Sequence, residues 1–213
     1  FSFSQETDYQ GFMDFSYNDD SGKIILEIDN LDNEFLYINS LSRGVGNNDL
    51  GLDRGQLGNS RIVYFTKRGN KILLIQPNLR YISNSSNELE NKAVEEAFAR
   101  SVLFGFDIVE KSTDSYKIDL TPFLLNDAHG VSQRLRFSNS GSYNLNKSMS
   151  AVDLERTKAF PDNIEFDVLL TFTGNPSGSL VRSVTPTASN LTVNQHHSFV
   201  KLPDDNYNKR KFD

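Results

Sequence analysis

Apolar side chains recur at every second position in several stretches of this chain, and this alternation limits the fold more than any other feature. Residues 13–17 and 24–28 both show it, on either side of a turn-forming Asn-Asp-Asp-Ser-Gly segment at 18–22. A period of two is the periodicity of a β-strand, whose successive side chains point to opposite faces of a sheet. We therefore expect these residues to form a β-hairpin.

Two further stretches have the pattern of hairpins, and one has the pattern of a central strand. The hairpins are expected over residues 62–75 and 104–120, each with a polar turn between two apolar runs. Pro77 ends the first of them, because proline has no N–H to give to a strand ladder. Residues 35–38 are apolar at every position, which indicates a strand covered on both faces.

The second half of the chain contains two more expected strands and two expected loops. Residues 166–172 alternate, and residues 191–202 form the last strand, which Pro203 ends. Ser, Asn and Gly are frequent at residues 138–150, and residues 174–178 contain two glycines and a proline. Such compositions are typical of surface loops. We expect both segments to lie outside the sheet.

One amphipathic helix is expected near residues 87–101. Ser85 followed by Glu88 forms a capping box, and Asn87 followed by Glu90 offers a second helix start. The apolar residues that follow recur at three- and four-residue spacing and form one stripe, which consists of Leu89, Ala93, Val94, Ala97 and Phe98. We expect this stripe to pack on a face of the sheet.

Together these elements predict a mainly β (α+β) fold, with antiparallel sheets or sandwich-like hairpins and one packed helix. A short second helix is expected near residues 121–127, where Pro122 occupies the first helical position. The 213 residues are enough for a single domain with its own core, and the sequence has no internal repeat.

Charge and composition exclude several classes of protein. The chain has 28 acidic and 22 basic residues, a formal net charge of −6, whereas dedicated nucleic-acid binders carry a basic excess. No apolar run approaches the ~20 residues that a membrane-spanning helix needs. The chain has no cysteine, which rules out disulfides and cysteine zinc sites. We therefore expect no nucleic-acid partner and no membrane span, and the composition predicts no oligomeric state.

The three histidines are the most obvious residues for chemistry. His129 stands alone, whereas His196 and His197 are adjacent in the last expected strand. Neighbouring side chains of a strand point to opposite faces, so these two rings could not hold one metal ion. The pattern favours one histidine packed in a half-buried face and the other exposed. No His-Glu-x-x-His, Gly-x-Ser-x-Gly or phosphate-loop motif occurs, so the residues identify no catalytic site and no cofactor.

Residues 44–58 form the most unusual segment, with five glycines among polar groups. Glycine permits positive φ and close backbone approach, so such a loop can be tightly folded. Asn47, Asn48, Asp49 and Asp53 could hold calcium, but their spacing matches no EF-hand loop. A structural loop, or one that docks on another domain, is the favoured interpretation.

Several strings of residues, in the same order along most of the chain, resemble a known family. These strings are residues 51–58, 101–106, 158–163, 170–174 and 195–205. They resemble bacterial zinc-dependent metalloproteases that carry a domain of unknown function, DUF5117, before the protease unit.

The resemblance implies that the chain is the non-catalytic N-terminal domain of such a protease. In that family an extended His-Glu-x-x-His-x-x-Gly-x-x-His signature holds the zinc, and this signature is absent from these residues. The resemblance also implies export to the periplasm, the cell surface or the medium. It makes residues 206–213, which contain the basic cluster 209–211, the start of a linker to the catalytic part.

We therefore expect a structural or regulatory domain that docks on the catalytic protease domain of the same polypeptide. The contacts would come from the glycine-rich segment and from residues 195–205, and the residues expected to make them are Arg43, Asp53, Arg54, Gln56, His196 and His197. Two alternatives stay open: a glycan- or peptide-binding module that delivers substrate, and an inhibitory pro-segment.

Overall fold

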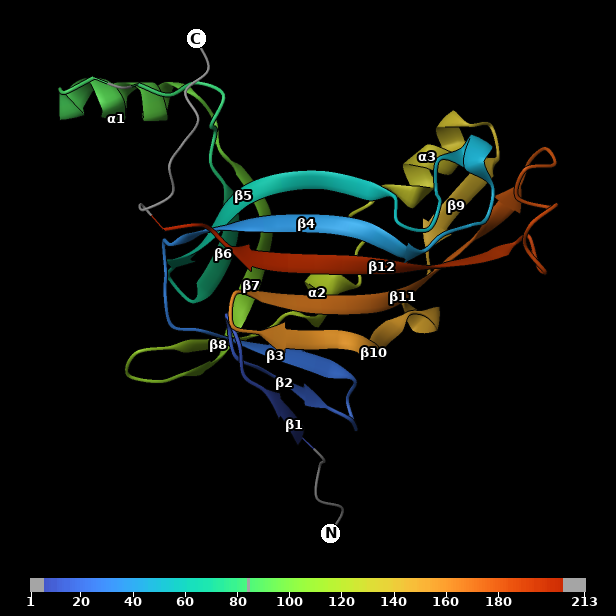
Figure 1. Cartoon of the computed structure of the whole chain (residues 1–213), viewed down its shortest axis with the longest axis horizontal. Coiled ribbons are helices and arrows are strands. Elements are labelled where there is room, and N and C mark those ends of the chain that lie inside the picture. The colour runs from blue at the N-terminus through green and yellow to red at the C-terminus, as the bar shows by residue number, and fades with distance from the viewer. Residues whose placement is uncertain (1–5, 84, 205–213) are drawn as a thin grey trace.

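The computed structural model describes residues 6–83 and 85–204, and one antiparallel sheet dominates this part of the chain (Figure 1). Of its twelve strands, all but β9 follow the order β1-β2-β3-β8-β7-β6-β5-β4-β12-β11-β10, and β9 pairs with β11 beside this path. The strands are β1 Glu6–Tyr9, β2 Phe15–Asn18, β3 Lys23–Ile28, β4 Glu34–Arg43, β5 Leu57–Arg68, β6 Lys71–Gln76, β7 Ser101–Lys111, β8 Tyr116–Asp119, β9 Gly141–Leu145, β10 Ala151–Phe160, β11 Asn163–Pro176 and β12 Asn190–Lys201. The helices are α1 Glu88–Ala97, α2 Thr121–Leu124 and α3 Val131–Phe137, with 3₁₀ turns η1 Asn48–Leu50 and η2 Lys147–Met149. The predicted mainly β fold is confirmed.

The sheet curls so that the two ends of its strand order approach each other. The ring of Phe15 in β2 lies 4.8 Å from the ring of Phe166 in β11. Close by, the backbone N–H of Phe12 donates to the carbonyl of Phe160, at the end of β10, over 2.8 Å. Glycine at position 11 permits this approach, because a Cβ there would lie 2.7 Å from the same carbonyl. The curled sheet therefore encloses a core between its two halves.

Aromatic side chains fill this core, and Phe199 of β12 lies among them. Its ring is 5.2 Å from that of Phe35 and 5.9 Å from that of Phe166. Helix α2 lies behind β12 and β11 in Figure 1 and places Phe123 between the two halves, 6.3 Å from Phe199 and 6.1 Å from Phe106 of β7. Burial of each such ring contributes about 1.5–3 kcal/mol to stability.

Most of the predicted elements are present. The three predicted hairpins are β2–β3, β5–β6 and β7–β8, and the last predicted strand is β12. The predicted central strand at residues 35–38 lies within β4, between β5 and β12. The predicted short helix is α2, which is limited to Thr121–Leu124. No helix in residues 6–83 and 85–204 is both long and apolar enough to cross a membrane. The predicted linker at 206–213 lies outside the described residues.

The two predicted loops are wrong in part, because both contribute residues to the sheet. Strand β9 lies inside the segment 138–150, and it pairs with residues 172–176 at the end of β11. Strand β10 pairs with residues 163–169 of the same strand, so β9 extends the same sheet edge. The glycine at 174 allows the approach, because a Cβ there would lie 2.0 Å from the carbonyl of Ser142.

The prediction that the amphipathic helix packs on the sheet is also wrong. Helix α1 forms where expected, but none of its residues is buried, and Figure 1 shows it projecting away from the sheet. The interior that it was expected to cover is filled by Phe123 and Leu124 of α2, which are both buried. Helical periodicity predicts an apolar stripe, but it does not say which surface covers that stripe.

Candidate functional site

The chain leaves the sheet between β6 and β7 and forms a projecting segment, described at residues 77–83 and 85–100, which we call the arm (Figure 1). Gln76 and Ser101 are paired across the two strands, so the arm leaves and returns at one place. At its base, the side-chain amide of Asn78 donates to the carbonyl of Ala99 over 3.2 Å. The arm is therefore held to the sheet at its two ends.

Helix α1 in the arm is stabilised by local polar contacts. Asn87 is its N-cap, and the side-chain oxygen accepts from the N–H of Leu89 over 3.0 Å. The hydroxyl of Ser85 donates to the carboxylate of Glu90 over 2.6 Å. Such a cap contributes about 1 kcal/mol to a helix, so α1 has a well-defined start although no core covers it.

The apolar side chains of the arm are exposed. Leu89 is 76% exposed and Ile82 is 66% exposed, and about half of Leu79 is open to solvent. The rings of Tyr81 and Phe98 stack on each other, with centroids 3.9 Å apart, which gives the arm some internal packing. Clustered exposed apolar side chains of this kind mark interaction sites on soluble proteins.

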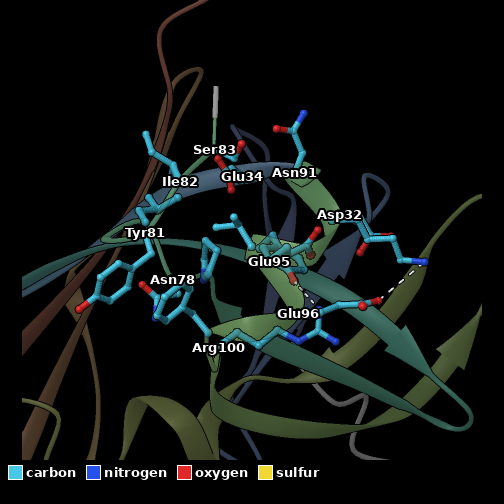
Figure 2. A pocket seen from close by; sticks show the side chains of 16 residues that line it. Asp32, Glu34, Asn78, Tyr81, Ile82, Ser83, Asn91, Glu95, Glu96 and Arg100 are labelled. Carbon is cyan, nitrogen blue, oxygen red and sulfur yellow. Dashed lines mark hydrogen bonds and ion pairs between the residues drawn. The ribbon is translucent and has the colours of Figure 1, made fainter. Parts of the chain in front are cut away.

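A groove of about 790 Å³ lies between the arm and the sheet (Figure 2). Its apolar lining comes from the arm, from Leu79, Tyr81, Ile82, Val94 and Phe98. Its charged lining comes from Asp32 and Glu34 on the sheet side, from Lys92, Glu95 and Glu96 of α1, and from Arg100 at the end of the arm. The groove thus combines an apolar wall with an excess of carboxylates.

Three of these carboxylates have no partner within residues 6–83 and 85–204. Glu96 forms an ion pair with Lys92, at 3.7 Å, on the exposed face of α1. Among the described residues, the side chains of Asp32, Glu34 and Glu95 have neither an ion pair nor a hydrogen bond. Their negative charge is therefore available to a cationic group that enters the groove.

The glycine-rich segment 44–58 folds tightly rather than forming an open loop. Leu50 and Leu52 are buried, and the guanidinium of Arg134 in α3 donates to the carbonyl of Leu50 over 2.8 Å. A Cβ on Gly44 would lie 2.2 Å from the carbonyl of Leu52, so only glycine fits this crossing of two backbone segments. The segment is a built part of the core.

Four of the residues expected to contact another domain lie in or near this segment. Arg43, Arg54 and Gln56 are exposed, and Asp53 is half-buried. Gln56 also lines a smaller hollow, of about 240 Å³, together with His129. These side chains are open to a partner, so the expectation that they contact one stays a prediction.

Asn47, one of the residues considered for calcium, has a structural role as the N-cap of η1. The side-chain oxygen of Asn47 accepts from the N–H of Asp49 over 3.0 Å, and its amide donates to the carbonyl of Leu180 over 3.2 Å. Within residues 6–83 and 85–204, no three His, Cys, Asp or Glu side chains are placed to hold one metal ion.

His196 lies between two carboxylates on one face of the sheet. Its Nε2 is 2.7 Å from Glu165 and its Nδ1 is 3.1 Å from Asp167, both on β11. Burial lowers the pKa of His196, but the hydrogen bonds to Asp167 and Glu165 outweigh burial and raise the pKa to about 9. Burial raises the pKa of each carboxyl, but hydrogen bonds from His196 and from Ser198 or Asn194 leave both values below the usual range. The cluster is therefore charged at neutral pH.

His197 points to the opposite face and is fully buried. Its Nδ1 lies 2.9 Å from the hydroxyl of Tyr37, and its Nε2 lies 3.1 Å from the carbonyl of Leu124 and 2.9 Å from the amide of Gln195. Burial lowers the pKa of His197 to about 4, so the ring is neutral at pH 7. A ring with its proton on Nε2 donates to Leu124 and accepts from Tyr37, whereas a ring with its proton on Nδ1 donates to Tyr37 and accepts from the side-chain amide of Gln195.

The positions of the two rings bear on two expectations, the contact of His197 with another domain and the exposure of one histidine. The two rings lie on opposite faces, as predicted, but His197 cannot contact another domain because core side chains cover it completely. His196 is not simply exposed, since its side chain is 22% exposed and paired with two carboxylates. Of the pair, only His196 can reach a partner.

Residues 55–213 match the family described as a domain of unknown function, DUF5117. The chain belongs to the DUF5117 family. No match was found among curated proteins, and none among solved structures.

The DUF5117 match covers the features that distinguish this structure. The arm, α1, the groove residues from position 64 onward and both histidines of β12 lie within residues 55–213. Of the glycine-rich segment 44–58, only residues 55–58 lie within the match. The sequence analysis did not predict a projecting arm, because the apolar stripe of α1 resembles that of a core helix. The apolar residues 79, 81 and 82, just after Pro77, are the signal that could have indicated it.

Proposed function

We propose that this DUF5117 domain is a non-catalytic docking domain, whose arm packs against a zinc metalloprotease unit carried on the same polypeptide. The observation that carries the proposal is that α1 has an apolar stripe and no buried residue. Leu89, Ile82 and Leu79 are left in solvent on one projecting segment.

The physical argument rests on the free energy of exposed apolar surface. Removing such surface from water is favourable by about 25 cal/mol per Å², so a partner that covers the arm gains several kcal/mol. Helix α1 gains little stability from burial, yet its N-terminus is capped and the base of the arm is held in place by a hydrogen bond. A rigid helix that presents apolar side chains is a common form of docking element.

The nature of the partner is inferred from the ordered strings that resemble the metalloprotease family. On this proposal the zinc and its ligands belong to the protease unit, and the protein is a bacterial one exported to the periplasm, the cell surface or the medium. Arg43, Asp53, Arg54, Gln56 and His196 would add polar contacts outside the arm.

Binding in solution tests the proposal. The 213-residue chain, with the substitutions Ile82→Glu and Leu89→Glu, is compared with the unchanged chain for binding to the separately produced protease unit. We expect the two substitutions to weaken binding by about tenfold or more, because a charge replaces an apolar anchor. Phe137→Glu is the matched control, since Phe137 is 73% exposed on α3, outside the arm. Binding that is absent, or weakened equally by the control, contradicts the proposal.

A second function, peptide binding for substrate delivery, is favoured by the groove itself. The groove is open and has an aromatic wall formed by the stacked rings of Tyr81 and Phe98. A peptide-delivery module would bind peptides in the absence of the protease unit and would lower the KM of the joined enzyme. Addition of the chain to the separated protease unit also tests the inhibitory alternative, which alone requires activity to fall.

A further inference from the structure

The groove beside the arm has a chemistry more specific than that of an apolar patch. Its lining combines apolar and aromatic side chains of the arm with Asp32 and Glu34, which precede and begin β4. Glu95 of α1 adds a third carboxylate without a partner among the described residues. Unpaired carboxylates around an apolar hollow are complementary to a cation attached to an apolar anchor.

The stacked rings of Tyr81 and Phe98 provide the apolar surface on which such an anchor would pack. Tyr81 is 46% exposed and Phe98 is 37% exposed, so each ring leaves surface open to the groove. In Figure 2, Tyr81 and Ile82 lie on one side of the hollow, with Glu95 and Glu96 on the side of α1. An aromatic or aliphatic side chain can therefore be buried while a neighbouring cation meets the carboxylates.

We propose that this groove binds a short segment in which lysine or arginine lies next to an aromatic anchor, and that the docking partner presents such a segment. The inference rests on the proposed function for the identity of the partner, but the site itself is defined by the groove. The cation meets Asp32, Glu34 and Glu95, and the anchor packs on Tyr81 and Phe98. Charge sets the specificity, and the apolar contact supplies most of the affinity.

The probe is a fluorescent peptide with the sequence Tyr-Asn-Lys-Arg-Lys-Phe, which is that of residues 207–212 and combines cations with aromatic residues. Its fluorescence anisotropy is measured as the full chain is added. A second peptide has glutamate in place of the three cations, and a third has alanine in place of both aromatic residues. We expect both changes to weaken binding by about tenfold or more. We also expect the basic peptide to bind several-fold less tightly when the salt concentration rises from about 50 to about 300 mM.

Variants of the chain locate the binding. Glu34→Lys and Glu95→Lys reverse two groove carboxylates and are expected to abolish most of the affinity for the basic peptide. Asp19→Lys is the matched control, because Asp19 is an exposed acid in the β2–β3 turn and does not line the groove. A chain in which Lys209, Arg210 and Lys211 are changed to glutamate tests whether these cations compete with the peptide; tighter binding to that chain also supports the site.

The outcomes separate this inference from the proposed function. Equal binding of the basic and the acidic peptide, no binding by any chain, or the same loss with Asp19→Lys overturns the groove specificity. If those results are obtained but the protease unit still binds through Ile82 and Leu89, the docking function holds and only the groove specificity fails. If the peptides bind as expected and the protease unit does not, the groove is a peptide site and the docking function fails.

Discussion

His196 and His197 are adjacent in β12, yet their rings have opposite electrostatic surroundings. His196 lies 2.7 Å from the carboxylate of Glu165, whereas His197 is fully buried, 2.9 Å from the hydroxyl of Tyr37. The alternation of a strand separates the two rings, one on each face of the sheet. Their pKa values accordingly lie on opposite sides of the usual 6.5, at about 9 and about 4.

The first prediction is a stability maximum near pH 6.5. The pKa of His196 is raised on folding, so its contribution is complete below pH 6.5 and is lost as the pH rises toward about 9. The pKa of His197 is lowered on folding, so its contribution is complete above pH 6.5 and is lost as the pH falls toward about 4. Urea unfolding across this range measures both slopes, and a free energy of unfolding that rises steadily from pH 6.5 to 9 contradicts this assignment.

The second prediction separates the two histidines. His196→Gln should remove most of the loss of stability between pH 6.5 and 9, which amounts to roughly 2–3 kcal/mol in the unchanged chain, since glutamine has no charge to lose. The loss of stability that His197 contributes as the pH falls should remain, whereas the part that His196 gives to Glu165 and Asp167 on the acid side should shrink. His129→Gln, a change at a half-buried ring outside this cluster, should leave the alkaline slope in place.

The third prediction concerns the partner of the buried ring. Tyr37→Phe removes the hydroxyl next to Nδ1 of His197 and leaves a buried polar atom without it, so we expect a loss of about 1–3 kcal/mol of unfolding free energy. Tyr64→Phe is the control, because its hydroxyl accepts only a long 3.4 Å contact from Arg100 at the surface. That change should cost less than about 0.5 kcal/mol. Equal costs would show that Tyr37 does not support His197.

The fourth prediction compares two glycines of the segment 44–58. Gly44→Ala places a Cβ 2.2 Å from the carbonyl of Leu52, a backbone atom that cannot move without distorting the loop. We expect it to cost about 3 kcal/mol or to prevent folding. Gly46→Ala has open space around the new Cβ and meets only the strain of φ +87°, which costs about 1–2 kcal/mol. Thermal unfolding of both variants tests the order, and a larger cost at Gly46 reverses it.

The fifth prediction is that the arm adds little to the stability of the isolated chain. Leu89 is 76% exposed, so Leu89→Ala should change the free energy of unfolding by less than about 0.5 kcal/mol. Leu26→Ala, at a completely buried position of β3, should cost about 2–5 kcal/mol. A cost at Leu89 similar to that at Leu26 would mean that α1 packs on a surface, contrary to the fold described above.

Local patterns predicted most of the strands, because the alternation of apolar residues is a direct consequence of strand geometry. The hairpin over 62–75 and the strand over 191–202 are present as β5–β6 and β12. Strands β1, β9 and β10 were not predicted. Strand β9 contains Gly141 and several polar residues, and its pairing with β11 is a long-range contact that the local sequence does not encode.

The candidate site was less predictable than the fold. The opposite faces of His196 and His197 follow from strand geometry alone, but the burial of His197 depends on Tyr37 and Leu124, which are far away in the sequence. The arm shows the same limit, since the stripe of α1 is compatible with either a core or a partner. Only the position of α2, which fills the interior, decides between them.

Hydrogen exchange of the arm tests the central claim most directly. The backbone amides of residues 88–97 are compared between the 213-residue chain and a longer polypeptide that joins it to the protease unit. The docking account predicts exchange slowed by about tenfold or more in the longer polypeptide, since a covered helix opens less often. Amides of the β2–β3 turn serve as the internal control and should be unchanged. Equal exchange rates for α1 in the two polypeptides would contradict the claim that the arm is the docking surface.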